Sequence, residues 1–246
     1  MKRWLKKYAA HLMLLILLSL TAIPFEAIAG SIGPAAAFRN EVLRTSTGEA
    51  PLVSVMEAKD LPGQLVTVQG VVVKNQVRIR GGKRSVHIQD ETGGIHIYDY
   101  RGPDAKAGNR IQVTGVVGDR QGLLEIRPTA APIQVLQKNK SVPAPSSLQM
   151  ADLNHAGRAE ALKGQLVKLP GQMKELPAGP TNGVYRIPVA DEAGNVITLV
   201  AMEGLLDLHE IRVGGTYEIT GILSQYETYE IIPQSPADLV AINPNK

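Results

Sequence analysis

The sequence predicts an all-β protein made of two five-stranded barrels in tandem, each preceded by a short helix. Apolar residues in the body of the chain recur with a period of two, which is typical of half-buried strands. Glycine-bearing turns separate these runs. Blocks of sequence also recur in the same order about one hundred residues apart, which indicates an internal duplication. Five short strands with such turns suffice for the core of a small barrel.

The N-terminus has the pattern of a secretory signal peptide. A basic start precedes the apolar run 12–23, which is short for a membrane span, and "AIA" at 27–29 fits a signal-peptidase site. We therefore expect residues 1–29 to be removed after Ala29, with 30–50 as a linker. The expected location is outside the cytoplasm: extracellular, cell-wall-associated or periplasmic. An uncleaved N-terminal anchor is the alternative.

Charge and cysteine content restrict the function. The chain holds 26 Lys+Arg and 23 Asp+Glu, and the signal segment contains four of the basic residues and Glu26. The mature chain is formally neutral, with 22 of each sign, so overall basicity does not predict a nucleic-acid partner. The absence of cysteine excludes disulfides, thiolate zinc sites, a cysteine nucleophile and a lipoprotein anchor.

Three matched blocks define the duplication. "GQLVTVQGVVV" (63–73) corresponds to "GQLVKLPGQMK" (164–174), "IQDETGGIHIY" (88–98) to "VADEAGNVITL" (189–199), and 108–128 to 214–233. These blocks place one domain at 51–137 and a more divergent one at 148–246. The Pro-, Ser- and Lys-containing segment 138–147 suits an extended linker between them.

Each element of the first copy follows from the local pattern. A helix is expected within 54–62, and another within 147–162 ahead of the second copy. The residues from Asp90 to Gly94 supply turn chemistry between the second and third strands. The expected strands of the first copy are 65–74, 84–90, 94–100, 109–118 and 123–127.

The first copy resembles the oligonucleotide/oligosaccharide-binding (OB) fold of bacterial domains that accompany secreted nucleases. The resemblance rests on V-x-V-x-G-x-V in the first strand, D-x-T-G-G-I after the second and G-x-x-I-x-V-x-G in the fourth, and it covers nearly all of 51–136. It implies a barrel that binds oligonucleotides, oligosaccharides or proteins. No nuclease domain follows in this sequence, so we expect no enzymatic activity.

The charge of the two copies differs in sign. Residues 51–140 hold 13 basic and 8 acidic residues, whereas 141–246 hold 7 and 12. The basic first copy suggests a polyanionic partner, although attraction between the domains is an equally simple explanation. Loop 74–84 gathers five Lys and Arg residues, and Arg120 lies in the loop 118–122. In an OB-fold both loops flank the binding face.

The hairpin "RSVHIQDETGGIHIYDYRG" (84–102) carries the side chains expected on that face. Alternation predicts that Val86, Ile88, Ile95 and Ile97 point into the barrel, and that His87, Gln89, His96, Tyr98 and Tyr100 point outward. A four-residue turn from Glu91 to Gly94 would set His87 opposite Tyr98 and Gln89 opposite His96. Bases could stack on these rings. The alternative is ordinary packing on a half-exposed strand.

The second copy lacks these side chains. Alignment replaces His87 by Pro188, Gln89 by Ala190, His96 by Ile197, Tyr98 by Leu199 and Tyr100 by Ala201. The corresponding face is then apolar and suits packing or contact with a protein.

Catalytic, metal and cofactor motifs were sought without success. The sequence contains no zinc-protease helix motif, nucleophile elbow, phosphate-binding loop or calcium loop. A metal site at His87 and His96 with Asp90 or Glu91 is a third interpretation of the hairpin, but the expected register makes the histidines diagonal. We therefore expect no metal and no cofactor.

The sequence-based hypothesis is an exported, non-enzymatic protein whose first domain binds single-stranded nucleic acid, with DNA as the expected form and with little sequence preference. The second domain would be structural or contact a protein. A cell-envelope adaptor that binds an anionic polysaccharide or a protein through the same face is the alternative. The expected binding residues are Arg78, Arg80, Lys83, Arg84, His87, His96, Tyr98, Tyr100 and Arg120.

Overall fold

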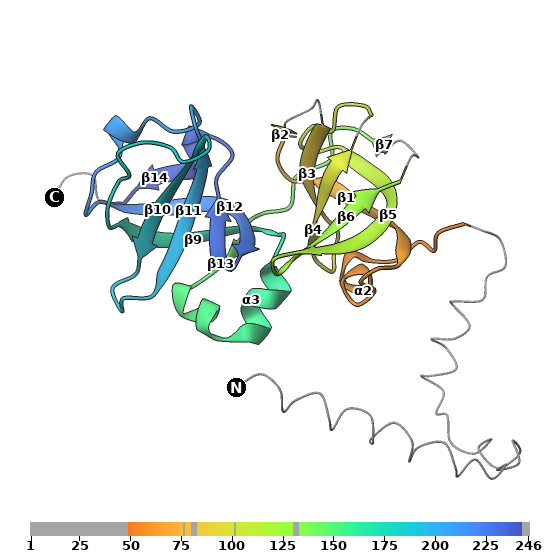
Figure 1. Cartoon of the computed structure of the whole chain (residues 1–246), viewed down its shortest axis with the longest axis horizontal. Helices are drawn as coiled ribbons and strands as arrows, with labels where there is room; N and C mark the ends of the chain where they lie inside the picture. Colours follow the sequence, from red (N-terminus) through yellow and green to blue (C-terminus); the bar gives the residue numbers. More distant parts are fainter. Residues whose placement is uncertain (1–48, 76, 80–82, 101, 130–132, 243–246) are drawn as a thin grey trace, which may run out of the picture. The chain divides into compact units, whose positions relative to one another are not determined.

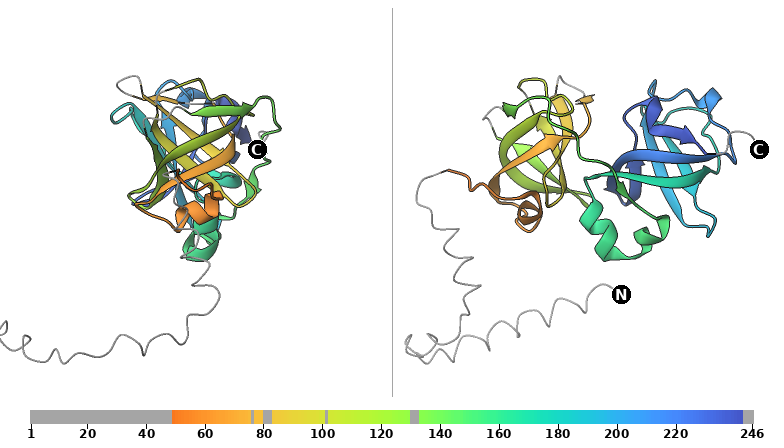
Figure 2. Two further views of the ribbon diagram at one scale, coloured as in Figure 1. Left: turned by 90° about the vertical axis from the view of Figure 1, so that its right-hand side faces the viewer. Right: turned by 180° about the vertical axis from the view of Figure 1, so that it is seen from behind.

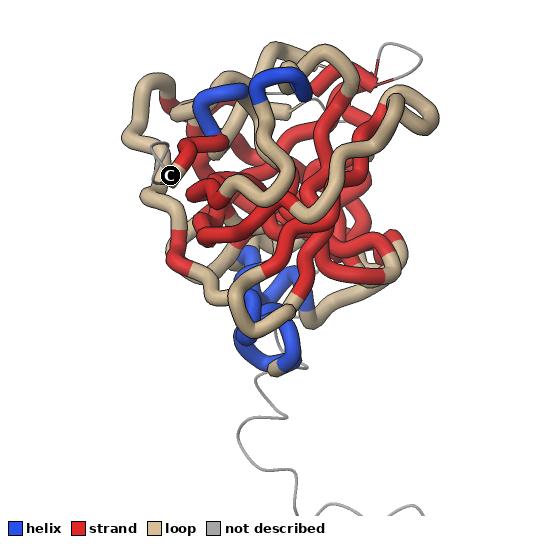
Figure 3. Tube along the Cα trace, turned by 90° about the vertical axis from the view of Figure 1, so that its left-hand side faces the viewer, coloured by secondary structure: helices blue, strands red, loops and turns tan. Residues whose placement is uncertain are grey.

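The computed structural model describes residues 49–75, 77–79, 83–100, 102–129 and 133–242. Strands are the main secondary structure of these residues, and the helices are short (Figures 1 and 3). Within these ranges, no helix has the length and apolar character needed to cross a membrane.

The first barrel closes through five strands. They are β1 (Leu65–Val72), β3 (Lys83–Gln89), β4 (Gly94–Tyr100), β5 (Arg110–Arg120) and β6 (Leu123–Pro128). The strands pair in the order β1-β3-β4-β6-β5, and β5 pairs back to β1, while β4 and β6 run parallel. This order and the single parallel pair are those of a five-stranded OB barrel. Two short strands extend it: β2 (Val77–Ile79) pairs with β3, and β7 (Gln134–Gln137) pairs with β5.

Helix α2 (Val55–Lys59) closes one end of the first barrel. Ser54 caps it in a reciprocal capping box with Glu57, and Val55 and Ala58 enter the barrel core. The Asp90 side chain links the helix to the β3–β4 turn, because it accepts a hydrogen bond of 2.8 Å from the Val55 backbone.

The second barrel repeats the first. Its strands are β9 (Leu166–Met173), β10 (Val184–Ala190), β11 (Val196–Met202), β12 (Thr216–Tyr226) and β13 (Thr228–Ile232). They pair in the order β9-β10-β11-β13-β12, β12 closes onto β9, and β11 and β13 are parallel. The prediction of two tandem five-stranded barrels is confirmed.

Short elements surround the second barrel. β8 (Ser146–Ser147) pairs with β9, so the predicted linker ends in a strand. The predicted helix at 147–162 consists of η2 (Met150–Asn154) and α3 (Ala156–Leu162). Further along the chain lie η3 (Leu208–Glu210), η4 (Pro236–Asp238) and β14 (Leu239–Ala241).

The two barrels contact each other within the compact unit 49–246 (Figure 2). Gln89 of β3 accepts a hydrogen bond of 2.7 Å from the backbone of Leu166 in β9. Lys163, which follows α3, donates at 2.6 Å to the carbonyl of Gly122 in the first barrel. A small apolar cluster of Val73, Leu166 and Ile222 also joins the two. These contacts determine which surfaces of the barrels face each other.

Candidate functional site

The β3–β4 hairpin has a different register from the one predicted. His87 lies opposite His96, and Ser85 lies opposite Tyr98. The turn begins one residue earlier than expected because the Asp90 carboxylate accepts hydrogen bonds from the backbones of Thr92 and Gly93. The register differs by two residues, which changes the cross-strand partners but does not by itself change the face on which a side chain lies.

The predicted outward position of Tyr100 is wrong. Tyr100 is 1% exposed and belongs to the core of the first barrel. The pairing of β3 with β4 shifts between Arg84 and Ser85, which leaves one extra residue between Tyr98 and Tyr100. Such a bulge reverses the alternation beyond it and turns Tyr100 inward. Burial raises the pKa of the Tyr100 hydroxyl, and this ring cannot serve as a platform for a base.

The basic residues predicted to bind the ligand differ in their exposure and in their contacts. The Arg84 side chain donates to the carbonyl of Gly102 and pairs with Asp104 at 3.3 Å, so it holds the loop after β4. Lys83 is half-buried at the start of β3 and interacts with neighbouring groups. Arg80 and the side chain of Arg78 lie outside the described residues. Arg120 is exposed at the end of β5.

The two histidines form a stacked pair on the outer face. Their ring centroids are 4.4 Å apart, with an interplanar angle of 18°. His96 contacts Ser85 Oγ through Nε2 at 2.5 Å, and its Nδ1 lies 3.4 Å from the Glu125 carboxylate on β6. Gln89 shares this outward face but is buried against the second barrel.

The electrostatics of this group favour a neutral His87 and an ionised Glu125. Burial, reinforced by the neighbouring His96, holds the pKa of His87 well below its usual 6.5. Burial opposes ionisation of Glu125, but the nearby His96 ring and the hydrogen bond from Arg127 outweigh it and lower the pKa of this carboxyl. The Glu125 charge is balanced locally by Arg127, 2.8 Å away.

Tyr98 and Arg120 form a cation–π pair beside the histidines. The Arg120 Cζ atom lies 4.8 Å from the centroid of the Tyr98 ring, and the ring contacts His96 at a centroid distance of 5.6 Å. The structure thus brings four predicted residues together on one surface: His87, His96, Tyr98 and Arg120.

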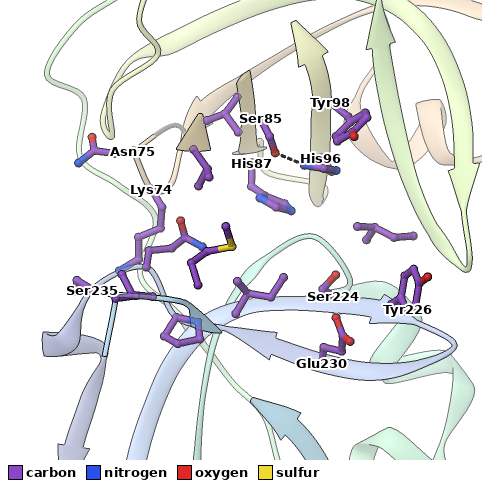
Figure 4. A pocket seen from close by; sticks show the side chains of 18 of the residues that line it. Lys74, Asn75, Ser85, His87, His96, Tyr98, Ser224, Tyr226, Glu230 and Ser235 are labelled. Atoms are coloured by element: carbon purple, nitrogen blue, oxygen red, sulfur yellow. Dashed lines mark hydrogen bonds between the residues drawn. The ribbon is translucent and has the colours of Figure 1, made fainter. Parts of the chain in front are cut away.

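This surface is one wall of a cleft of about 990 Å³ between the barrels. Figure 4 shows His87, His96 and Tyr98 on one side, with Ser224, Tyr226 and Glu230 facing them from the other. The second wall belongs to β10, β12 and β13 of the second barrel. The predicted face is therefore not an open sheet surface but part of a site shared by two barrels.

The second wall also carries an arginine and a tyrosine. The Arg186 Cζ atom lies 5.7 Å from the Tyr226 centroid, and Arg186 pairs with the Glu230 carboxylate. Neither residue belongs to the set of binding residues predicted from the sequence. Tyr226 stands in the acidic run "SQYETYE", and Arg186 is isolated in the sequence, so only the tertiary arrangement brings them to the cleft.

The predicted apolar outer face of the second barrel is wrong. Ile197, Leu199 and Ala201 lie in its core at 0–1% exposure, and the alternate residues Thr198, Val200 and Met202 point the other way. The structure pairs Pro188 with Thr198, where His87 pairs with His96 in the first copy. The sequence alignment of this strand was displaced by one residue, which exchanges the two faces.

The described residues contain no group of three or more His, Asp or Glu side chains arranged to hold a metal ion. The cleft instead offers flat rings, guanidinium groups and the carboxylates of Glu203 and Glu230, of which Glu230 is paired with Arg186. That combination suits the binding of a ring-bearing anion by stacking and by charge-assisted hydrogen bonds.

The strand order and the shared cleft define the chain as a tandem OB-fold protein. No protein-family model matches it. The chain is similar to Endonuclease YhcR of Bacillus subtilis (strain 168), with 36% identity over 190 residues, which is 76% of this chain. The match spans only 16% of the length of that protein.

Several solved structures show a more distant likeness. A murine DNA-binding protein bound with double-stranded DNA is 10% identical, and the match covers 73% of this chain and 98% of that protein's chain, with a TM-score of 0.39. The p202 HIN2 domain is 14% identical, covering 73% and 95%, with a TM-score of 0.35. The hypothetical protein ygiW from E. coli is 20% identical, covering 36% and 97%, with a TM-score of 0.28.

Proposed function

We propose that this protein binds single-stranded nucleic acid, with little sequence preference, in the cleft beside the first barrel. The observation that carries the proposal is the Tyr98–Arg120 pair, which stands on the β3–β4 face of an OB barrel and lines the cleft. In this fold that face, together with the adjoining loops, receives oligonucleotides.

The chemistry of the pair matches a single strand. Every base has a flat face that can stack on a tyrosine ring, so stacking tolerates any sequence. A guanidinium can donate two parallel hydrogen bonds to a phosphate oxygen pair. The Arg120 guanidinium lies over the Tyr98 ring, so the group that can stack on a base and the group that can bind a phosphate are adjacent. The similarity to Endonuclease YhcR, whose name indicates action on nucleic acid, supports a nucleic-acid partner for the segment that the two proteins share.

The proposal predicts that Tyr98→Ala and Arg120→Gln each weaken binding of a labelled oligothymidylate by about fivefold or more, as expected for the loss of one stacked base or one phosphate contact. Fluorescence anisotropy of the full chain measures the effect. Arg110→Gln, an exposed arginine at the opposite end of the same strand, is the matched control and should bind normally.

An anionic polysaccharide or a protein is the competing ligand for the same face, because sugar rings also stack on tyrosine. A parallel titration with an anionic glycan and a neutral glycan separates these classes. Binding of the neutral glycan that is insensitive to salt, without binding of the oligonucleotide, would overturn the proposal.

We also propose that the chain acts without catalysis, since the cleft residues identified above suit binding. Labelled single-stranded DNA incubated with the protein and divalent cations should stay intact. Fragments that disappear on addition of a chelator would contradict this.

The N-terminal pattern supports export as a further proposal. The exported protein should begin at Gly30 when its N-terminus is sequenced. A mature protein that retains residues 1–29 would contradict cleavage after Ala29.

A further inference from the structure

Each barrel contributes one arginine–tyrosine pair to the same cleft. Arg120 and Tyr98 belong to the first barrel, and Arg186 and Tyr226 to the second. All four residues line the cleft, and Figure 4 shows the two tyrosines on opposite walls. The second wall therefore offers the same two functional groups as the first.

Equivalent strand positions show that the second pair is not a copy of the first. Gly118 pairs with Glu125 in the first barrel, and Ser224 pairs with Glu230 in the second, so Tyr226 occupies the position of Arg120. In the same way, Arg186 pairs with Val200 and occupies the position of Ser85, which pairs with Tyr98. The duplication alone does not produce this arrangement, because the arginine and the tyrosine stand on different strands in the two copies.

The contacts between the barrels keep the two walls facing each other. Lys74 beside the first barrel pairs with Asp238 of η4 at 2.6 Å, and the Asp238 side chain is 9% exposed. At the other side of the cleft, Lys163 bonds to the carbonyl of Gly122 and to the Gln225 side chain at 2.7 Å. A ligand in the cleft thus meets both walls without requiring a rearrangement of the junction.

The charges of the second wall are compatible with a phosphate. Two acidic residues, Glu203 and Glu230, line the cleft, and the buried carboxylate of Glu230 pairs with the Arg186 guanidinium. A guanidinium has five N–H donors, so it can hold a carboxylate and still donate to a phosphate. Half of the Arg186 side chain surface is exposed, whereas 5% of the Glu230 side chain is. The guanidinium is therefore the more accessible of the two groups, both of which line the cleft.

We propose that the second barrel forms half of the nucleic-acid site, with Tyr226 as a second stacking platform and Arg186 as a second phosphate contact for the same single strand. This inference rests on the proposed function of the first wall. It differs from the sequence-based hypothesis, which assigned the second domain a structural or protein-contacting role.

The decisive variant is Tyr226→Ala, because Tyr226 is 42% exposed and its removal leaves the Arg186–Glu230 ion pair intact. With an oligothymidylate of about twelve nucleotides, long enough to meet both walls, the full chain carrying this change should bind about tenfold more weakly. Tyr226→Phe should restore most of the affinity, since the stacking ring remains.

Arg212→Gln provides the charge control for Arg186→Gln. Arg212 is an exposed arginine of the second barrel that does not line the cleft. Only the Arg186 variant should lower the affinity and reduce its salt dependence. Circular dichroism of each variant verifies the fold, because loss of Arg186 leaves Glu230 buried without this partner.

Normal binding by Tyr226→Ala alongside weakened binding by Tyr98→Ala would overturn this inference and leave the proposed function standing. Absence of oligonucleotide binding by the unmodified chain would overturn both. Photo-crosslinking to an oligonucleotide that contains iododeoxyuridine gives an independent readout. Crosslinks should map to both Tyr98 and Tyr226, and crosslinks confined to the first barrel would contradict the shared site.

Discussion

His87 combines an exposed strand position in the sequence pattern with a half-buried position in the structure. Its ring stacks on His96, and its Nε2 atom is buried without a hydrogen-bond partner among the described residues. A charged imidazole in this place would lose hydration and lie against a second histidine. His87 is therefore a neutral surface for packing in the cleft wall, rather than a charged contact for phosphate.

This environment predicts a pH dependence of stability. The pKa of His87 is near 6.5 in the unfolded chain and well below that in the folded chain, so between these values the unfolded state binds more protons. The stability that neutral His87 contributes is then fully present above pH 6.5 and is lost as the pH falls toward the pKa of His87 in the folded chain. Urea unfolding at about pH 7 and about pH 5 should show a smaller loss for His87→Asn than for the unmodified chain. Equal losses would show that His87 does not carry this effect.

The residues that sequence predicted well are those whose position follows from strand alternation alone. Val86, Ile88, Ile95 and Ile97 lie in the core, and His87, His96 and Tyr98 lie on the other face. Tyr100 escaped prediction because a bulge adds one residue to the strand pairing and leaves no mark on the alternation.

At the scale of elements, the β3–β4 turn and the segment after α3 approach each other closely. A Cβ atom on Gly164 would lie 2.4 Å from the Gly94 carbonyl oxygen, and Gly164 has a φ of +82°. Two backbones can come this close only where side chains are absent. These glycines therefore fix the contact between the barrels at one end of the cleft.

Gly164→Ala should lower the free energy of unfolding by more than an alanine substitution at a glycine whose only constraint is its positive φ. Gly194 is the matched control, because its φ is +86° and nothing lies within 4 Å of its Cβ position. We expect the Gly164 variant to lose about 1–3 kcal/mol more of the free energy of unfolding than Gly194→Ala, as overpacking does elsewhere. Equal unfolding midpoints in urea would contradict the close approach.

The strand order was predictable at this scale, and the register was not. Periodicity and the duplicated blocks carry enough information to place five strands per copy. The register of the hairpin depends on which turn residue accepts the backbone hydrogen bonds, and Asp90 does so here. The incorrect alignment of Ile197 has the same origin, because the hairpin turns of the two copies differ in the number of residues between the paired strand ends.

At the scale of the whole molecule, the candidate site is a property of the junction between the barrels. Its walls come from segments about one hundred residues apart, and no local pattern links Tyr98 to Tyr226. The opposite charges of the two copies contribute to this junction, as the Lys74–Asp238 ion pair shows. Lys74 belongs to the loop whose basic residues the sequence analysis assigned to a polyanion, so part of that charge serves contact between the barrels.

The most direct test of the central claim is the affinity of the full chain for single-stranded DNA as a function of salt concentration. If about four phosphates are contacted, the logarithm of the association constant should fall with the logarithm of salt concentration at a slope near −3. Tyr98→Ala should lower the affinity at every salt concentration and keep the slope, whereas Arg120→Gln should make the slope shallower. An absence of binding, or binding with no dependence on salt, would contradict the account.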